Sequence, residues 1–356
     1  MSTKKIAIVI ADMAAPGGAE KVAADLAEEF YSRNHDVTVI KFEEYGDIPR
    51  FSYPGRTIHL HLPSRAGGLP RQVFTLLKRA WYFRKVFQQE KFDHIFSFLE
   101  ASNVPCALAS RDAVLSMHLD PDKMTRHEWR AVRWFYPRAK RVITVSRQMK
   151  DLLVERAHLG NVRCIYNPVN IRLINEKARE PIAFEGRFIL AVGRLERQKR
   201  FDLLIEAYAR SQVQQECKLV IVGKGSQREL LEQQIAALGI QERVILAGFE
   251  VNPYKYMAKA EFQVMSSDYE GYPLVLIEAL ALGCPIVSTD CPTGPREIIR
   301  SGENGLLVER GQVDALAAGI DEMFLNTAMR EKMRHQAKES VNSNDIAAVA
   351  DAWLAV

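Results

Sequence analysis

The feature that most limits the fold is an alternation of short apolar segments with longer helical segments, which runs through the chain twice. The first round begins with a strand pattern at Lys5–Ile10, passes a glycine-containing turn into a helical pattern over Ala19–Ser32, and reaches a strand pattern at Asp36–Ile40. Such an alternation is typical of βαβ units, in which the strands are parallel and helices cover both faces of the sheet. The sequence therefore predicts an α/β protein.

The remaining elements follow the same alternation. The other strands predicted in the first half are His59–Leu62, His94–Phe98, Ala113–Met117 and Arg141–Val145. The elements predicted in the second half are strand Phe188–Val192, helix Phe201–Ser211, strand Lys218–Val222, helix Gln227–Leu238, strands Arg243–Leu246 and Glu261–Met265, helix Pro273–Leu282 and strand Pro285–Ser288.

The two rounds meet at Asn167-Pro168, a dipeptide that favours a turn. A chain of 356 residues also corresponds to about two domains. We therefore predict two Rossmann-like domains with parallel sheets that face each other across a cleft. The N-terminal domain covers residues 1–168, the C-terminal domain covers 169–343, and a C-terminal helix over 344–356 crosses back onto the first domain. Ligands of such sheets bind at the carboxyl ends of the strands.

Composition narrows the class further. The hydrophobic share of 47% and the charged share of 26% are those of a globular protein rather than a disordered chain. No segment reaches the ~18–20 consecutive apolar residues of a membrane-spanning helix, and the apolar run at the N-terminus is too short for the core of a signal peptide. The five cysteines have no CxxC spacing, which favours a reducing, cytoplasmic setting over a disulfide scaffold or a zinc site.

The charge is distributed unevenly. Residues 1–170 contain 26 Lys and Arg against 18 Asp and Glu, whereas residues 171–356 contain 22 against 26. Residues 48–89 contain eight basic residues and no acidic one. The first half is therefore expected to attract an anionic partner, which could be a phosphate, a lipid headgroup or a nucleic acid. A solvated basic face is the plain alternative.

Residues 71–87 combine basic with aromatic residues at helical spacing. An apolar face is predicted at positions 73, 76/77, 80, 83/84 and 87, while Arg71, Lys78 and Lys85 recur every seven residues as a second stripe. A basic amphipathic helix with Trp and Phe suits a membrane surface. A helix packed on the core, with an incidental charged rim, stays open as the alternative.

Two turns that follow predicted strands could bind phosphate. Gly17 and Gly18 open a helix directly after the first strand, where glycine lets the backbone approach an anion and the helix N-terminus offers unpaired N–H groups. Arg194 and Lys199 follow the strand at 188–192 and would supply a planar fork and a point charge to a diphosphate. An ordinary tight turn or a solvated loop, without a bound phosphate, is equally consistent with these residues. The Gly223-Lys224-Gly225 turn has a weaker claim.

A third candidate is Glu270 and Glu278, which stand eight residues apart around a predicted helix start. The segment Gly271-Tyr272-Pro273-Leu274 forms the first turn, with Pro273 suited to the first helical position, and its free N–H groups would face a phosphate. Glu278 interrupts an apolar run, where a carboxylate is costly unless it is paired, for example with ribose hydroxyls. The alternative is a capping Glu and a rim Glu.

The histidines and one acidic motif complete the candidates. His118 follows an apolar strand, and a lone histidine in such a position is more often structural than functional. His59 and His61 are interpreted as strand residues, because no third metal ligand is suggested nearby. Asp120 and Asp122 form a DxD pattern, but a proline-containing turn after His118 explains it equally well, so no metal site is predicted.

Together these motifs resemble the family-four retaining glycosyltransferases, which have the GT-B fold of two Rossmann-like domains. The resemblance is carried by Gly17-Gly18-Ala19-Glu20, His118, the Val-Gly-Arg…Gln-Lys run at 192–199, and above all the E-x7-E pair Glu270/Glu278. It spans about residues 4–350 in the right motif order. The segment 288–299 is similar to the subgroup that extends lipid-linked oligosaccharides, including bacterial N-glycan transferases and their O-antigen relatives.

The resemblance implies a role for each donor-side residue. Arg194 and Lys199 would hold the diphosphate of the donor, Glu278 the ribose, and Glu270 the transferred sugar. The backbone of Gly271, Tyr272, Pro273 and Leu274 would contact sugar and phosphate. Gly17 and Gly18 would approach the diphosphate from the other domain, and His118 would lie beside the reacting face of the sugar.

The resemblance also implies the partners. The donor is expected to be a UDP-sugar that supplies a hexose or an N-acetylhexosamine with retention of configuration, without a metal or another cofactor. The acceptor is expected to be a polyprenyl-pyrophosphate-linked saccharide, held by Arg71, Lys78 and Lys85 on the inner face of the cytoplasmic membrane. Nucleic acid is not expected as a partner. The alternatives are a transferase with a soluble acceptor, a nucleotide-sugar epimerase on the same fold, or a non-enzymatic basic module that binds membrane or nucleic acid.

Overall fold

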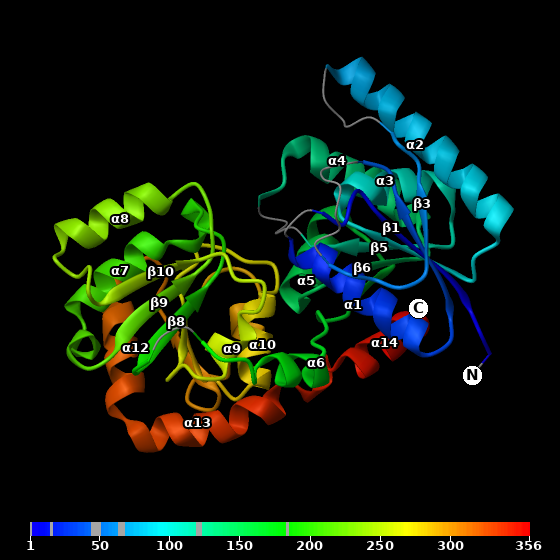
Figure 1. Cartoon of the computed structure of the whole chain (residues 1–356). Helices are drawn as coiled ribbons and strands as arrows, with labels where there is room; N and C mark the ends of the chain where they lie inside the picture. The colour runs from blue at the N-terminus through cyan, green and yellow to red at the C-terminus, as the bar shows by residue number, and fades with distance from the viewer. Residues whose placement is uncertain (1, 15–16, 44–50, 63–67, 119–122, 183–184) are drawn as a thin grey trace. The chain divides into compact units, whose positions relative to one another are not determined.

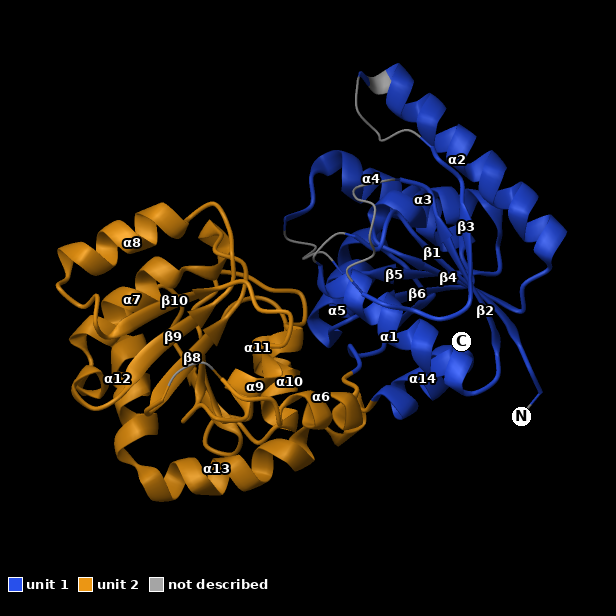
Figure 2. Cartoon of the chain, viewed as in Figure 1, with its two compact units in different colours: residues 1–168, 346–356 blue, residues 169–345 orange. Residues whose placement is uncertain are grey.

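The computed structural model describes residues 2–14, 17–43, 51–62, 68–118, 123–182 and 185–356. Within them the chain forms two α/β units (Figure 1). Unit 1 consists of residues 1–168 and 346–356, and unit 2 of residues 169–345 (Figure 2). Across the described residues, no helix is both long enough and apolar enough to cross a bilayer.

Unit 1 is built on a seven-stranded sheet in the order β3-β2-β1-β4-β5-β6-β7, and all its neighbouring strands pair in parallel. The strands are β1 (Lys5–Ile10), β2 (Asp36–Lys41), β3 (Arg56–His59), β4 (His94–Phe98), β5 (Ala113–Met117), β6 (Arg141–Thr144) and β7 (Val162–Cys164). The helices are α1 (Gly18–Ser32), α2 (Leu69–Glu90), α3 (Glu100–Ala109), α4 (Arg126–Phe135), α5 (Arg147–Ala157) and α14 (Ile346–Leu354). Figure 1 shows α1 and α14 on one side of this sheet and α2 and α3 on the other.

The C-terminal helix α14 belongs to the core of unit 1. The indole of Trp353 packs against the rings of Phe96 and Phe98 on β4, at centroid distances of 5.1 and 5.3 Å. Arg33, at the end of α1, donates a hydrogen bond of 2.8 Å to the carbonyl of Ala347. Burial of a large apolar side chain contributes about 1.5–3 kcal/mol, so the buried Trp353 helps to hold α14 against the sheet of unit 1.

Unit 2 has a six-stranded parallel sheet in the order β10-β9-β8-β11-β12-β13. The strands are β8 (Phe188–Val192), β9 (Lys218–Val222), β10 (Val244–Gly248), β11 (Gln263–Met265), β12 (Ile286–Thr289) and β13 (Gly305–Val308). The helices are α6 (Ile171–Lys177), α7 (Phe201–Arg210), α8 (Arg228–Ala237), α9 (Tyr254–Met257), α10 (Leu274–Ala281), α11 (Pro295–Ile298), α12 (Val313–Leu325) and α13 (Thr327–Ser340).

Both sheets reverse their strand order next to the first strand of the unit. The reversal lies between β1 and β4 in unit 1 and between β8 and β11 in unit 2. In open parallel sheets, ligands bind beyond the carboxyl ends of the strands at this point, because the connecting helices leave in opposite directions and open a crevice. The loops that follow β8 and β11 are therefore where a ligand of unit 2 is expected.

The predicted fold class is confirmed, and five strands have the predicted bounds: β1, β4, β5, β8 and β9. The strand predicted at His59–Leu62 is wrong, because β3 lies at Arg56–His59. Pairing with β2 sets this register, from Thr38 opposite Arg56 to Lys41 opposite His59. His61 has a φ of 45° and lies beyond the strand, so His59 and His61 do not alternate on one strand face.

The apolar face predicted for α2 is buried only in part. Of the positions assigned to its apolar face, Ala80, Phe83 and Phe87 are buried, but Val73 and Leu77 are about half exposed. The buried stripe instead includes Thr75, Arg79, Ala80, Phe83 and Phe87. The reason is Arg79, which is fully buried, forms an ion pair with Glu43, and lies over the ring of Phe42 at 4.6 Å.

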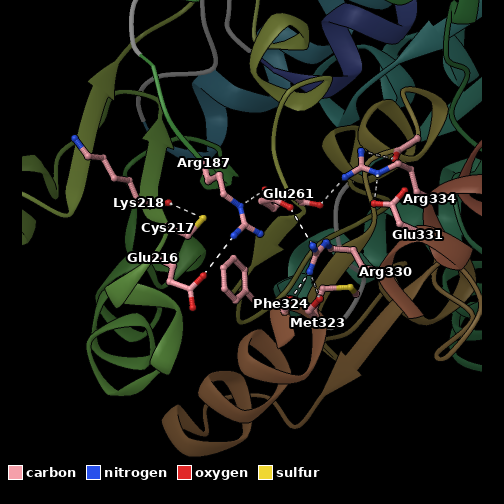
Figure 3. Close-up of polar contacts among 11 residues, drawn as sticks. Arg187, Glu216, Cys217, Lys218, Glu261, Met323, Phe324, Arg330, Glu331 and Arg334 are labelled. Carbon is pink, nitrogen blue, oxygen red and sulfur yellow. Dashed lines mark hydrogen bonds and ion pairs between the residues drawn. The ribbon is translucent and has the colours of Figure 1, made fainter. Parts of the chain in front are cut away.

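A network of ion pairs lies at the amino-terminal edge of the unit 2 sheet (Figure 3). Glu261 precedes β11, and its Oε1 lies 2.7 Å from Arg187 Nε while its Oε2 lies 3.3 Å from Arg330 on α13. Although burial raises the pKa of Glu261, the hydrogen bond from Arg187 and the charges of Arg187, Arg330 and Arg334 hold that pKa below its usual range. The carboxylate thus links β8, β11 and α13, far from the carboxyl ends of the strands.

Glu261→Gln should destabilise unit 2 by about 2 kcal/mol, because it leaves the buried Arg330 without its full counter-charge. At neutral pH this corresponds to a Tm lower by about 4–8 °C. A carboxylate with a depressed pKa stabilises the fold above its unfolded pKa, and this stabilisation is lost as the pH falls through the folded value. The difference between wild type and variant in thermal melts should therefore shrink below about pH 4.

Glu216→Gln is the matched control, because Glu216 touches the same Arg187 at 3.5 Å but its side chain is 63% exposed. It should change the Tm by less than about 1 °C. An equal loss of stability in both variants would contradict the role assigned to Glu261.

Candidate active site

The loop after β8 carries two of the predicted cations. It runs through Gly193 and Arg194 into a single turn of 3-10 helix at Arg197–Lys199, and α7 follows. Arg194 is exposed, and it is near enough to Glu196 to help lower the pKa of that carboxyl, whose main cause is hydrogen bonding to Ser226. Arg194 is thus placed at the carboxyl edge of the sheet with its guanidinium accessible.

Lys199 and Glu270 form the central contact of this edge. Lys199 Nζ lies 2.6 Å from Glu270 Oε1, and Ser267 Oγ donates a hydrogen bond of 2.6 Å to the same oxygen. Both charged side chains are largely buried, at 16% and 9% exposure. A charge-assisted bond in a partly desolvated position is stronger than an exposed ion pair. The structure thus joins two residues that the sequence placed 71 positions apart.

Further hydrogen bonds hold the two loops together around this ion pair. The side-chain amide of Gln198 donates a hydrogen bond of 2.7 Å to the carbonyl of Tyr269, and the backbone N–H of Asp268 donates one of 2.9 Å to the carbonyl of Gln198. Ser266 Oγ also donates 2.8 Å to the carbonyl of Lys199. The loop after β8 and the loop after β11 therefore form one rigid assembly, and the position of Lys199 does not depend on the ion pair alone.

The turn at Gly223-Lys224-Gly225, after β9, packs against the loop after β8. A Cβ on Gly223 would lie 1.8 Å from the carbonyl oxygen of Gly193, and Gly223 has a φ of 158°. The N–H of Leu195 donates 3.0 Å to the carbonyl of Lys224. These glycines are required for the close approach of two backbones, which explains the motif without a ligand.

Glu278 lies on α10 and is 4% exposed. Tyr254, on α9, donates a hydrogen bond of 3.2 Å from its hydroxyl to Glu278 Oε1. The buried carboxylate that the sequence singled out is therefore partly satisfied within the protein, and this tyrosine was not predicted. No spacing rule could have paired it with Glu278, because the two are brought together only by the packing of α9 on α10.

The segment between the two glutamates presents backbone rather than side chains. Helix α10 begins at Leu274 with Pro273 as its N-cap, one residue later than predicted. Tyr272 is buried, and its hydroxyl accepts a hydrogen bond of 3.1 Å from Asn344. The carbonyls of Glu270 and Gly271 accept from the hydroxyl of Thr293 at 3.0 and 2.8 Å. This frame fixes Gly271 and the first turn of α10.

In unit 1, Gly17 is the N-cap of α1 and Gly18 is its first residue, at the carboxyl end of β1. A Cβ at Gly17 would lie 2.0 Å from Glu20 Oε2, so a larger residue there would require the carboxylate of Glu20 to shift. Glu20 is buried in the first turn of α1, where a carboxylate is favourable for the helix dipole. Pro16, in the same motif, lies outside the described residues.

His118 follows β5 and is partly buried. Its Nε2 lies 2.9 Å from Ser116 Oγ, and its ring lies 5.9 Å from that of Phe98. Burial lowers the pKa of His118 to about 4, so the imidazole is neutral at physiological pH. Asp120 and Asp122, the DxD pattern, lie outside the described residues. Elsewhere, in the part of the chain that the structure describes, no group of three His, Cys, Asp or Glu side chains is arranged to hold a metal.

Helix α2 carries the three basic residues that were predicted to hold the acceptor. Arg71 and Lys85 are exposed and Lys78 is partly exposed; we call these three the basic stripe. Beside them lies an exposed ridge made of Val73, Phe74, Leu77 and Trp81, with Phe74 66% and Trp81 58% exposed. Lys85 Nζ lies 5.6 Å from the centre of the Trp81 ring. The predicted basic stripe is therefore accompanied by an apolar ridge on the solvent side of the helix.

The two parallel α/β units form a GT-B type fold, and comparison with known proteins identifies the chain as a glycosyltransferase. Residues 16–173 match the model described as Glycosyltransferase Family 4, and residues 174–340 match Glycosyl transferases group 1. Among solved structures, a glycosyltransferase from Rickettsia africae superimposes with a TM-score of 0.82 at 17% identity, covering 100% of this chain and 98% of the other. The Anabaena protein Alr3699/HepE in complex with UDP gives 0.79 at 22% identity, covering 99% and 98%.

Two relatives from Campylobacter jejuni align over nearly their full length. One is the N-acetylgalactosamine-N,N'-diacetylbacillosaminyl-diphospho-undecaprenol 4-alpha-N-acetylgalactosaminyltransferase, 32% identical over 94% of each chain. The other, 25% identical over 98% of this chain and 97% of its own, is named as an alpha-1,4-N-acetyl-D-galactosaminyltransferase that acts on a GalNAc-containing diNAcBac-PP-undecaprenol. The chain belongs to the group 1 and family 4 glycosyltransferases, and it is an enzyme of that class rather than a non-enzymatic binding module.

Removing Lys199 and removing Arg194 should have different effects on stability. Lys199→Met leaves the buried Glu270 carboxylate without its cation, which should cost about 2–4 kcal/mol, whereas Arg194→Ala removes an exposed side chain and should leave the Tm unchanged. Both should lower the transfer rate by about 10²-fold or more if both cations stabilise the leaving group. Thermal melts and the rate of nucleotide release measure the two effects.

The double variant Lys199→Met/Glu270→Gln is the control for the ion pair. It removes both charges together and should recover most of the lost Tm while staying inactive. Turnover close to wild type in a single variant would show that the cation removed in that variant does not take part in transfer.

Proposed function

We propose that this enzyme is a retaining glycosyltransferase that moves a hexose or N-acetylhexosamine from a UDP-sugar to a polyprenyl-pyrophosphate-linked saccharide, without a metal ion. The observation that carries the proposal is the buried Lys199–Glu270 pair, held rigidly at the strand-order reversal of unit 2 beside the accessible Arg194. The names of both Campylobacter relatives support the acceptor class.

The donor chemistry follows from charge. When a nucleoside diphosphate leaves a sugar, negative charge develops on its phosphates, and preorganised cations and helix N-termini stabilise that charge. Arg194 and Lys199 would supply the cations, and the N–H groups of Gly271 and the first turn of α10 would supply the dipole. These groups would do the work that a divalent cation performs in other transferases.

The two glutamates would orient the donor. Glu278 would accept hydrogen bonds from the ribose hydroxyls, with Tyr254 holding its carboxylate in place. Glu270, fixed by Lys199 and Ser267, would accept from hydroxyls of the transferred sugar. Unit 1 would contribute Gly17 and Gly18 to the diphosphate. His118, which is neutral, would hydrogen-bond the sugar rather than act as a cation.

Helix α2 would bring the enzyme to its acceptor at the inner face of the cytoplasmic membrane. The exposed ridge would enter the headgroup region, and the basic stripe would contact the acceptor pyrophosphate and anionic lipids. The support is the arrangement of the helix, in which the ridge and the stripe lie on its solvent side.

The test is a nucleotide-release assay in EDTA with UDP- and GDP-sugars and polyprenyl-pyrophosphate saccharides, combined with thermal melts in UDP. UDP at about 100 times its Kd should stabilise the enzyme by about 2.7 kcal/mol. Glu278→Gln is the control, since it should reduce this shift without removing the fold. An enzyme that releases nucleotide only when a divalent cation is added would contradict the metal-independent mechanism, and one that uses only GDP-sugars would contradict the donor.

Arg71→Gln, Lys78→Gln and Lys85→Gln, combined in one variant, should leave UDP binding unchanged and raise the KM for a lipid-pyrophosphate acceptor. Each basic residue near an anionic surface contributes about 1 kcal/mol, so a rise of roughly 100-fold is expected. Arg84→Gln is the matched control, because Arg84 is an exposed cation of α2 outside the basic stripe. An equal loss with a short soluble acceptor would show that the basic stripe is structural.

A further inference from the structure

Glu100 lies in a strained turn at the carboxyl edge of the unit 1 sheet. It is the first residue of α3 and follows Leu99, whose φ of 70° and ψ of 158° form a backbone conformation that is essentially restricted to glycine. The turn is held by Ser102, whose hydroxyl contacts the carbonyls of Phe98 and, at 3.0 Å, Leu99. A non-glycine residue in this region marks a position where the fold tolerates strain, and such positions are often functional.

The carboxylate of Glu100 is incompletely satisfied. Its Oε1 is shielded from solvent and has no hydrogen-bond partner among the described residues. Burial, together with the negative charge of Glu128 on α4, raises the pKa of Glu100 to about 7, although a bond from its own backbone N–H opposes the shift. A shielded oxygen without a partner costs about 1–3 kcal/mol. The bond from its own backbone N–H engages the carboxylate at the start of α3, but Oε1 stays without a partner.

The charged groups on the neighbouring elements are already engaged with other partners. Arg79, from α2, donates 3.5 Å to the carbonyl of Ala101 and is paired with Glu43. Near the ends of β1 and β2, Asp12 lies 3.6 Å from Lys41.

Directly after β5, the neutral His118 contacts Ser116. Asn103 of α3 donates to the hydroxyl of Tyr136. These polar groups therefore have partners of their own, and none of them donates to Glu100 Oε1.

The position of Glu100 indicates a ligand. Strands β4 and β5 are adjacent, and Phe98 pairs with Ser116. Glu100 and His118 each lie two residues beyond this pair, at the edge where open parallel sheets bind ligands. The ring contact between Phe98 and His118 keeps the two segments together. A hydrogen-bond donor from a bound molecule would satisfy Oε1 at this edge.

We propose that Glu100 forms an acceptor subsite, in which its Oε1 accepts a hydrogen bond from a hydroxyl or an amide N–H of the acceptor saccharide. The proposal rests on the proposed function, because it assigns the acceptor to unit 1 and the donor to unit 2. Glu100 binds through its ionised form, and binding relieves the cost of the unpaired oxygen.

Glu100→Gln keeps the shape of the side chain and removes the charge. It should raise the KM for the acceptor about tenfold, because a charge-assisted bond becomes a neutral one. The KM for the donor and the slow release of UDP without acceptor should stay at wild-type values. Glu155→Gln, at an exposed glutamate of α5, is the matched control and should change none of these values.

The pH dependence separates a binding role from a structural one. With a pKa of about 7, the ionised fraction of Glu100 rises about tenfold between pH 6 and pH 8, so the acceptor KM of the wild type should fall about tenfold over that interval. The KM of Glu100→Gln should be flat. Glu100→Asp keeps the charge but shortens the side chain, and it should retain the pH dependence at a higher KM.

Stability provides the second readout. A carboxyl whose pKa is raised in the folded state destabilises that state as the pH rises from about 4.5 to 7, so Glu100→Gln should raise the Tm more at pH 8 than at pH 5. A higher Tm with an unchanged acceptor KM would overturn the subsite and leave Glu100 as a strained structural residue. A wild-type enzyme that releases no UDP with any lipid acceptor would instead overturn the proposed function itself.

Discussion

The ion pair between Lys199 and Glu270 is the contact on which the candidate active site depends. It joins the loops that follow β8 and β11, the two strands between which the sheet of unit 2 reverses its order. Each charge alone would be costly in this largely buried position, so each is retained because the other is present. The hydrogen bonds of Gln198 and Ser266 then make the pair part of a rigid edge. An anion that enters this edge meets a cation whose position is already fixed, which is the condition for electrostatic stabilisation of a leaving group.

Much of this edge could be predicted from the sequence, because parallel α/β folds place the residues that follow each strand at one edge of the sheet. Strands with continuous apolar runs, such as Phe188–Val192, are recognisable by composition, and the residues that follow them must lie at the carboxyl edge. Arg194, Lys199 and Glu270 could therefore be selected without coordinates. The contact between Lys199 and Glu270, the support from Ser267 and the bond from Tyr254 to Glu278 could not, because they depend on which strands are neighbours and how α9 packs.

Two sequence predictions were incorrect, one for the buried face of α2 and one for the strand at His59–Leu62, and both depend on contacts that the sequence alone does not show. Helical periodicity indicates that α2 has an apolar face, but it cannot tell a buried face from an exposed one when apolar residues occur on both. In α2 the buried Arg79 determines which face points inward, because it pairs with Glu43 and contacts the ring of Phe42. A periodicity argument counts arginine as solvent-facing, so it misses Arg79 and wrongly includes Val73 and Leu77, although Ala80, Phe83 and Phe87 are buried as predicted. The strand at His59–Leu62 was misplaced for a similar reason, because pairing with β2 rather than local alternation sets the register of β3.

The buried arginine has a consequence for function. Because Arg79 faces inward, Phe74 and Trp81 face solvent beside the basic stripe, instead of being used in the core. A leucine at position 79 could pack against Phe42 with less desolvation, and buried ion pairs are often no more stabilising than such replacements. An arginine that reaches Glu43, however, accepts only one rotation of α2 about its axis, whereas apolar contacts tolerate several. The polar contact therefore specifies the orientation of the helix more than it stabilises it, and that orientation is what keeps the aromatic ridge and the basic stripe exposed.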